Sequence, residues 1–218
     1  MMKNSILLSC LLCLVFMSGC AFIDKNRNLN PKNEIYDLND SNSTNLISYN
    51  KDVLNLLNTI DKYKNKKTRV DCSGLVDLFN RLNNNIFYEN QEMYRHVQKN
   101  RGKSQAIYNL YSSNNKITNK KPMAGDLIFF NNTTKATKNK KTKIITHIGI
   151  VQDVEDDGRV SFIHNIRGIN KIGYVNLNKK NTFKDNLVVQ NSYIIRCKSN
   201  KTSCLTSNRF AGFGVVVR

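Results

Sequence analysis

The apolar positions between residues 52 and 82 recur every three or four residues, which is the spacing of amphipathic helices. A first stripe covers residues 53–63. A second stripe begins at Cys72 and ends at residue 82, and Asp71 stands at its N-cap position. The pattern therefore predicts two helices with Cys72 at the N-terminus of the second, and weaker helical patterns follow over residues 91–98 and 104–111.

After residue 120 the pattern changes to short apolar runs between polar segments, which is typical of β-strands. The predicted strands cover residues 126–130, 144–154, 159–165, 173–177, 187–195 and 212–217. The segment between the first two strands is rich in Lys, Asn and Thr, and we expect it to be a solvated loop. Helices followed by a run of strands predict an α+β fold with N-terminal helices packed on an antiparallel β-sheet.

The N-terminus has the pattern of a secretory signal peptide. An apolar run over residues 6–17 follows Lys3 and precedes the small residues Ser18 and Gly19. The run is too short for a transmembrane helix, which needs about 20 residues. Residues 1–19 are therefore expected to direct export and to be removed.

The residues at the end of this segment, Met17-Ser18-Gly19-Cys20, resemble the lipobox of bacterial lipoproteins, with Met17 in place of the usual leucine. The resemblance implies that Cys20 carries fatty acyl chains such as palmitate and anchors the protein to a membrane surface. The alternative is an ordinary signal peptide in which Cys20 is incidental. Residues 20–45 contain few apolar side chains and are predicted to form a flexible tether.

The chain of 218 residues has a formal charge of +18, and loss of Lys3 with the signal peptide leaves +17. Such a protein is attracted to polyanions. An exported protein meets anionic lipid headgroups and cell-wall carboxylates, so nucleic acid is not the expected partner. Because Lys and Asn are abundant together, much of this charge could instead be solvated surface.

The cysteines and histidines restrict the candidate chemistry. Of six cysteines, Cys10 and Cys13 lie in the signal peptide, and the mature chain keeps Cys72 together with a Cys197–Cys204 pair that could form a disulfide. The cysteines show no metal-ligand spacing. Cys72 would then be an odd thiol in an exported protein, and a helix N-terminus favours its thiolate.

Only three histidines are available to activate that thiol, namely His96, His147 and His164. His147 lies in an apolar, β-branched run, where a structural histidine is the alternative interpretation. His164 follows on the next predicted strand and stands opposite His147 if the turn centres on residues 155–156, whereas a register one residue longer places Asn165 there. We expect a wide turn or a β-bulge that lets His164 orient the His147 ring.

Four blocks together resemble the NlpC family of papain-like cell-wall peptidases over residues 52–193. They are Asp71-Cys72-Ser73-Gly74-Leu75-Val76, Pro122-Met123-Ala124-Gly125-Asp126-Leu127-Ile128-Phe129-Phe130, His147-Ile148-Gly149-Ile150-Val151 and Phe162-Ile163-His164. The resemblance implies a papain-like domain over residues 46–218 that requires no metal or organic cofactor.

By the same resemblance, Cys72 is the nucleophile, His147 the general base and acid, His164 the orienting residue, and the Cys72 N–H an oxyanion donor. Asp71 and Asp126 are expected to be structural. The family's Tyr-x-Trp-Gly-Gly stretch before the cysteine is missing. Tyr63 is the candidate substitute for its tyrosine, and Ser73 is a second candidate for substrate binding.

The implied function is hydrolysis of an amide in the peptidoglycan stem peptide, between γ-D-glutamate and the diamino acid, through an acyl-enzyme. The alternatives are an N-acetylmuramoyl-L-alanine amidase of the same fold, an acyl transferase, and a non-catalytic lipoprotein that binds cell wall. The expected location is the bacterial cell envelope, at the periplasmic face of the outer membrane or the cell surface. Peptidoglycan and the membrane surface are the expected partners, and the sequence does not predict an oligomeric state.

Overall fold

In the computed structural model, which describes residues 41–195, 197 and 201–216, the two amphipathic stripes form helices α1 (Ser41–Tyr63) and α2 (Cys72–Leu82). Helix α1 begins at Ser41, so it includes the last five residues of the segment that was predicted to be a flexible tether. Helix α2 has the predicted bounds, and the Asp71 carboxylate accepts a hydrogen bond from the Gly74 N–H at 2.6 Å. The weaker patterns form α3 (Asn90–Arg95) and α4 (Lys103–Ser113).

The strands form a six-stranded antiparallel sheet in the order β1-β8-β2-β3-β4-β5. Their bounds are β1 (Ile117–Thr118), β2 (Leu127–Asn131), β3 (Ile145–Val154), β4 (Arg159–Ile166), β5 (Ile169–Asn176) and β8 (Phe210–Gly214). Helices with one antiparallel sheet confirm the predicted α+β class.

The strand predicted over residues 187–195 is wrong for most of its length. A separate hairpin of β6 (Lys184–Asp185) and β7 (Val188–Val189) turns at Asn186 and Leu187, which both have positive φ. Asn191 then donates its side-chain amide to two loop carbonyls instead of extending a ladder. The chain continues through the 3₁₀ turn η1 (Thr202–Cys204) and α5 (Thr206–Arg209).

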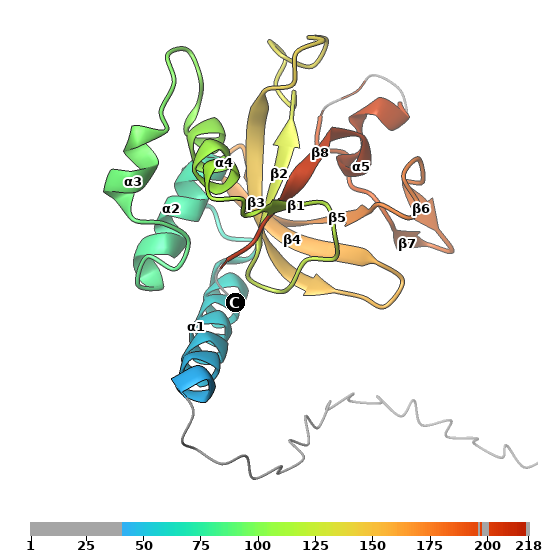
Figure 1. Ribbon diagram of the computed structural model, residues 1–218. Helices are drawn as coiled ribbons and strands as arrows, with labels where there is room; N and C mark the ends of the chain where they lie inside the picture. The colour runs from blue at the N-terminus through green and yellow to red at the C-terminus, as the bar shows by residue number, and fades with distance from the viewer. Residues whose placement is uncertain (1–40, 196, 198–200, 217–218) are drawn as a thin grey trace, which may run out of the picture. The chain divides into compact units, whose positions relative to one another are not determined.

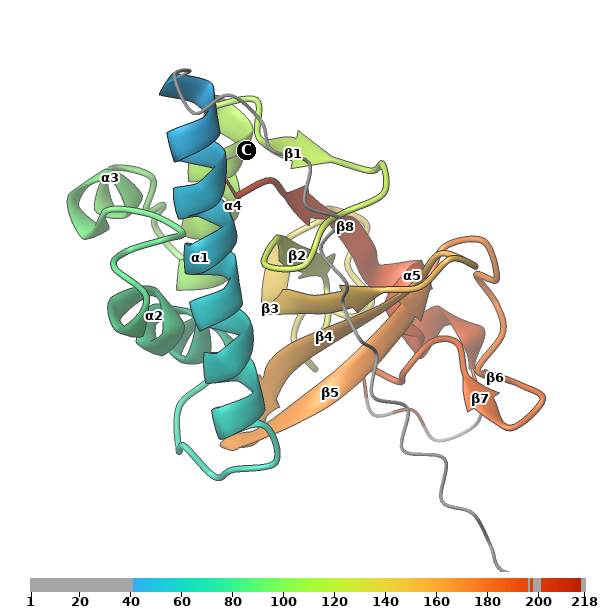
Figure 2. The same ribbon diagram turned by 90° about the horizontal axis from the view of Figure 1, so that it is seen from below.

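Figures 1 and 2 show helices α1 to α4 grouped beside the sheet, with α5 and the β6–β7 hairpin at the other end of it. Two apolar cores account for this layering. One core joins the helices to one sheet face through residues such as Phe79, Phe129 and Ile148, and the other covers the opposite face around Phe130 and Phe162. Because both faces of β2 are covered, all five of its residues are buried.

Cys197 and Cys204 are joined by a disulfide, and Cys72 is the free thiol among the described residues. The predicted signal peptide and Cys20 lie outside the residues that the structure describes. Within residues 41–216, apart from the gaps at 196 and 198–200, no helix is both long and apolar enough to cross a membrane.

Candidate active site

The thiol of Cys72 stands at the first turn of α2. The N–H groups of this turn have no acceptor within the helix, and they favour negative charge at the helix N-terminus. Asp71 Oδ1 accepts hydrogen bonds from the Gly74 N–H and, at 3.0 Å, from the buried Ser73 hydroxyl. Asp71 is therefore the helix cap, as predicted, and the Ser73 hydroxyl is engaged in the same cap.

The two histidines predicted to work together lie in contact. His147 Nε2 on β3 is 2.8 Å from His164 Nδ1 on β4, and the two rings are almost perpendicular, at 88°. His147 is half-buried, whereas His164 is only 2% exposed. The arrangement thus combines a ring that can reach the thiol with a second ring shielded from water behind it.

The register between β3 and β4 explains how the rings meet. Ile150 pairs with Ile163, so one further residue along the ladder brings Gly149 opposite His164. A bulge interrupts the ladder between Val151 and Asp153, as expected. The direct His147–His164 pairing considered from the sequence is wrong, because Gly149 and not His147 lies opposite His164. The two rings meet diagonally across the strands, over a position where Gly149 has no side chain.

Asn165, the other candidate for the third position, lies away from His147. Its buried side-chain amide donates to Thr68 Oγ1 at 3.1 Å and to Asn170 Oδ1 at 2.7 Å, and its Oδ1 accepts from the Gly168 N–H at 2.8 Å. Asn165 therefore holds the β4–β5 turn against the loop that precedes α2.

Electrostatics assign the roles of the ring nitrogens. Burial, followed by the charges of His147 and Lys171, holds the pKa of His164 well below its ordinary value, so His164 is neutral. A neutral His164 can accept at Nδ1 the proton that a charged His147 carries on Nε2. The Nδ1 atom of His147 is then the ring nitrogen left for Cys72.

The surroundings of Cys72 favour the thiolate. Burial alone raises its pKa, but attraction to His147 and a hydrogen bond with that ring, together with hydrogen bonds from Ser104 and the Ile148 backbone, outweigh burial and lower the pKa overall. The thiol also lies 4.0 Å from the Thr146 carbonyl oxygen, at the start of β3. A lowered thiol pKa beside an imidazole is the condition for nucleophilic chemistry at neutral pH.

Ser104 is a residue of this site that the sequence did not indicate. Its buried hydroxyl lies 3.7 Å from Cys72 Sγ. Lys103 forms an ion pair with Asp77 on α2, and Gln105 Oε1 accepts the Ile145 N–H at 2.8 Å, so the start of α4 is tied to both α2 and β3. No spacing between residues 72 and 104 signals this contact, because it depends on how α4 packs.

The remaining candidates have structural positions. The Tyr63 ring packs edge-on against Phe79 with centroids 5.6 Å apart, and its role in substrate binding stays a prediction, as does that of Ser73. Asp126 is fully buried and accepts N–H groups of Met123 and Val216, which supports the structural role expected for it. His96 is half-buried at the C-cap of α3.

Within the part of the chain that the structure describes, no group of three or more His, Cys, Asp or Glu residues gathers as a metal site.

The fold and the site define a class of protein, in which a cysteine at a helix N-terminus faces a histidine on an antiparallel sheet. The family model described as the NlpC/P60 family matches residues 62–191, which is more than half of the chain and includes Cys72, His147 and His164. The chain belongs to the NlpC/P60 family, and its helices and six-stranded sheet fit that family's papain-like α+β fold. No curated protein and no solved structure matches it.

Membership of the family supports cell-wall cysteine peptidase activity in general terms.

Proposed function

We propose that the protein hydrolyses an amide bond in peptidoglycan stem peptides, between γ-D-glutamate and the diamino acid, through an acyl-enzyme on Cys72. The observation that carries the proposal is the Cys72 thiol with a lowered pKa at the N-terminus of α2, beside the His147–His164 pair. The choice of bond rests on the family resemblance.

In the first half-reaction the Cys72 thiolate attacks the carbonyl carbon of the scissile amide. The oxygen that becomes negative is stabilised by the Cys72 N–H, which has no helical partner because it lies in the first turn of α2. His147 gives its proton to the leaving amine, the C–N bond breaks, and an acyl-thioester remains on Cys72.

In the second half-reaction a water molecule gives a proton to His147 and attacks the thioester carbonyl. The C–S bond breaks, the acid product leaves, and the thiolate and the charged imidazole are restored. Throughout, neutral His164 accepts the Nε2–H of His147, so the ring keeps its orientation and presents Nδ1 to the thiol.

We also propose that residues 1–19 are a signal peptide and that acylated Cys20 anchors the mature protein to a membrane surface of the cell envelope. The apolar run, the small residues before Cys20 and the polar composition of residues 21–40 support this location. A surface anchor with a positively charged domain would keep the site close to peptidoglycan.

The experiment that tests the activity is digestion of purified peptidoglycan with the full-length protein and with its Cys72→Ala variant, followed by mass analysis of the released fragments. Fragments that end at γ-D-glutamate, released by the native protein alone, are the expected result. Free stem peptides that begin with L-alanine would instead identify an amidase. Binding to peptidoglycan without any fragments would identify a non-catalytic binding protein.

A further inference from the structure

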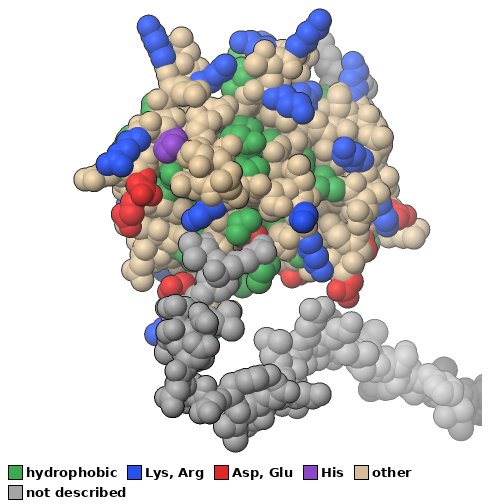
Figure 3. All heavy atoms as spheres, in the orientation of Figure 1, with side chains coloured by type: hydrophobic (Ala, Val, Ile, Leu, Met, Phe, Trp, Pro, Cys, Tyr) green, Lys and Arg blue, Asp and Glu red, His purple; other side chains and the backbone are tan. Residues whose placement is uncertain are grey.

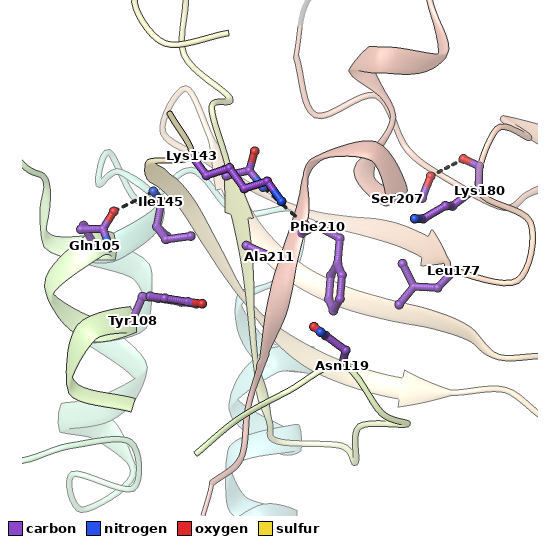
Figure 4. Close-up of a pocket in the computed structure, with 11 residues that line it drawn as sticks. Gln105, Tyr108, Asn119, Lys143, Ile145, Leu177, Lys180, Ser207, Phe210 and Ala211 are labelled. Atoms are coloured by element: carbon purple, nitrogen blue, oxygen red, sulfur yellow. Dashed lines mark hydrogen bonds between the residues drawn. The ribbon is translucent and has the colours of Figure 1, made fainter. Parts of the chain in front are cut away.

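A pocket of about 600 Å³ lies between α4 and the end of the sheet where β3 and β8 begin. Figure 4 shows its lining side chains, which come from α4, from α5, from the β2, β3 and β8 strands, and from the segments that precede β3 and follow β1 and β5. Its volume is within the range of small-molecule sites, roughly 300–1,000 Å³. The sequence motifs do not include any of the residues that line it.

The pocket borders the candidate active site on two chain segments. Ser104 contacts the Cys72 thiol, and the next residue, Gln105, lines the pocket. Thr146 places its carbonyl oxygen beside the same thiol, and the preceding residue, Ile145, lines the pocket. The hydrogen bond from the Ile145 N–H to Gln105 Oε1 therefore lies at the boundary between the two sites.

The charged groups of the pocket are all positive. Lys143 and Lys180 line it, and Figure 4 shows their side chains pointing toward one another from opposite sides of Phe210. No Asp or Glu is among the lining residues, and neither lysine forms an ion pair with any residue that the structure describes. Figure 3 shows Lys and Arg side chains spread over the face that is turned to the viewer in Figure 1, whereas the fewer Asp and Glu side chains lie near its margins.

Neutral polar groups in the pocket are also available to a ligand. The Tyr108 hydroxyl and the Asn119 amide line the pocket and make no hydrogen bond with described residues. The apolar part of the wall consists of Ile145, Leu177, Ala211 and the Phe210 ring. A fitting ligand therefore combines an anionic group with polar and apolar atoms, as a peptide that ends in or carries a carboxylate does.

We infer that this pocket is an anion-binding subsite that receives a carboxylate of the stem peptide while a neighbouring amide lies at Cys72. The inference rests on the proposed function, because the peptide bound in the pocket is the substrate that Cys72 would cleave. Lys143 and Lys180 supply the charge, and the Tyr108 hydroxyl and the Asn119 amide supply hydrogen bonds. The subsite would select peptides by the charge they carry beside the scissile bond.

The test uses full-length protein carrying Cys72→Ala, so that bound peptide stays intact. Its Kd is measured for a synthetic stem peptide with free carboxylates and for the same peptide with those carboxylates amidated. Lys143→Gln combined with Lys180→Gln is expected to raise the Kd for the free-carboxylate peptide roughly tenfold and to leave the weaker binding of the amidated peptide unchanged. Lys99→Gln, which removes an exposed lysine outside the pocket, is the matched control and should change neither Kd.

An unchanged Kd for the free-carboxylate peptide in the double variant would overturn the inference, as would an equal loss for both peptides. Competition by inorganic phosphate, with equal affinity for both peptides, would assign the pocket to a phosphate-bearing ligand and also overturn it. The binding measurement is independent of hydrolysis. Charge-dependent binding without cleavage by the Cys72-containing protein would therefore refute the proposed function and leave the subsite standing.

Discussion

Replacing His164 by alanine tests the coupling between the two histidines. The change removes the Nδ1 atom that lies 2.8 Å from His147 Nε2, and it leaves no acceptor for the proton on that nitrogen. A hydrogen bond that involves a charged group contributes about 1.5–3 kcal/mol. At about 1.4 kcal/mol for each factor of ten in rate, kcat/KM is expected to fall about 10- to 100-fold.

The same variant should alter the thiol. With the imidazolium of His147 less well stabilised, the attraction that lowers the pKa of Cys72 weakens, and the pKa rises toward its ordinary value. The rate of alkylation of Cys72 should then show its midpoint at a higher pH than in the native protein. This second measurement separates a role in the site from a loss of folded protein.

A conservative variant provides the control. The His164 ring packs on Phe162, with centroids 4.9 Å apart, so alanine also leaves a cavity and lowers the free energy of unfolding. His164→Asn keeps an acceptor close to the position of Nδ1, because both atoms are one bond from Cγ, and it should restore much of kcat/KM. If His164→Ala kept native kcat/KM and an unchanged alkylation profile, the orienting role would be refuted.

Three further predictions concern the thiol and the sheet beside it. In the native protein, alkylation of Cys72 should have its midpoint below that of an ordinary thiol, and the rate should fall as pH drops through the lowered pKa. His147→Ala should move the midpoint to higher pH, and no movement would contradict the assigned pairing. Ser104→Ala removes one of the hydrogen bonds that lower this pKa, so the same titration should move upward by less than in the His147 variant, whereas a downward shift would exclude the contact. Gly149→Ala places a methyl group 2.8 Å from a backbone carbonyl oxygen of β4; we expect a loss of about 1–3 kcal/mol in the free energy of unfolding and a lower kcat/KM in the protein that folds. Gly102→Ala, at a site with no heavy atom within 4 Å, is its control, and equal thermal stability of the two variants would disprove the steric argument.

The helix that carries the nucleophile was predictable because its determinants are local. Asp71 caps a turn that ends three residues later, and the apolar stripe from residue 75 to residue 79 faces a single core. The short apolar runs likewise predicted β2, β3 and β4 within a few residues of their observed bounds. The same pattern failed over residues 187–195, where a buried amide at Asn191 hydrogen-bonds to loop carbonyls, because apolar content alone does not reveal such partners.

The sequence by itself determined the elements and the candidate chemistry of this protein: an amphipathic helix with Cys72 at its first turn, strands that carry His147 and His164, and the blocks that mark the NlpC/P60 family. These features depend on residues a few positions apart. Only the tertiary structure decided that His164 and not Asn165 contacts His147, that Ser104 reaches the thiol, and that Lys143 and Lys180 share a pocket. Those contacts join residues far apart in the chain, and they depend on a one-residue bulge and on how α4 packs, which no local pattern specifies.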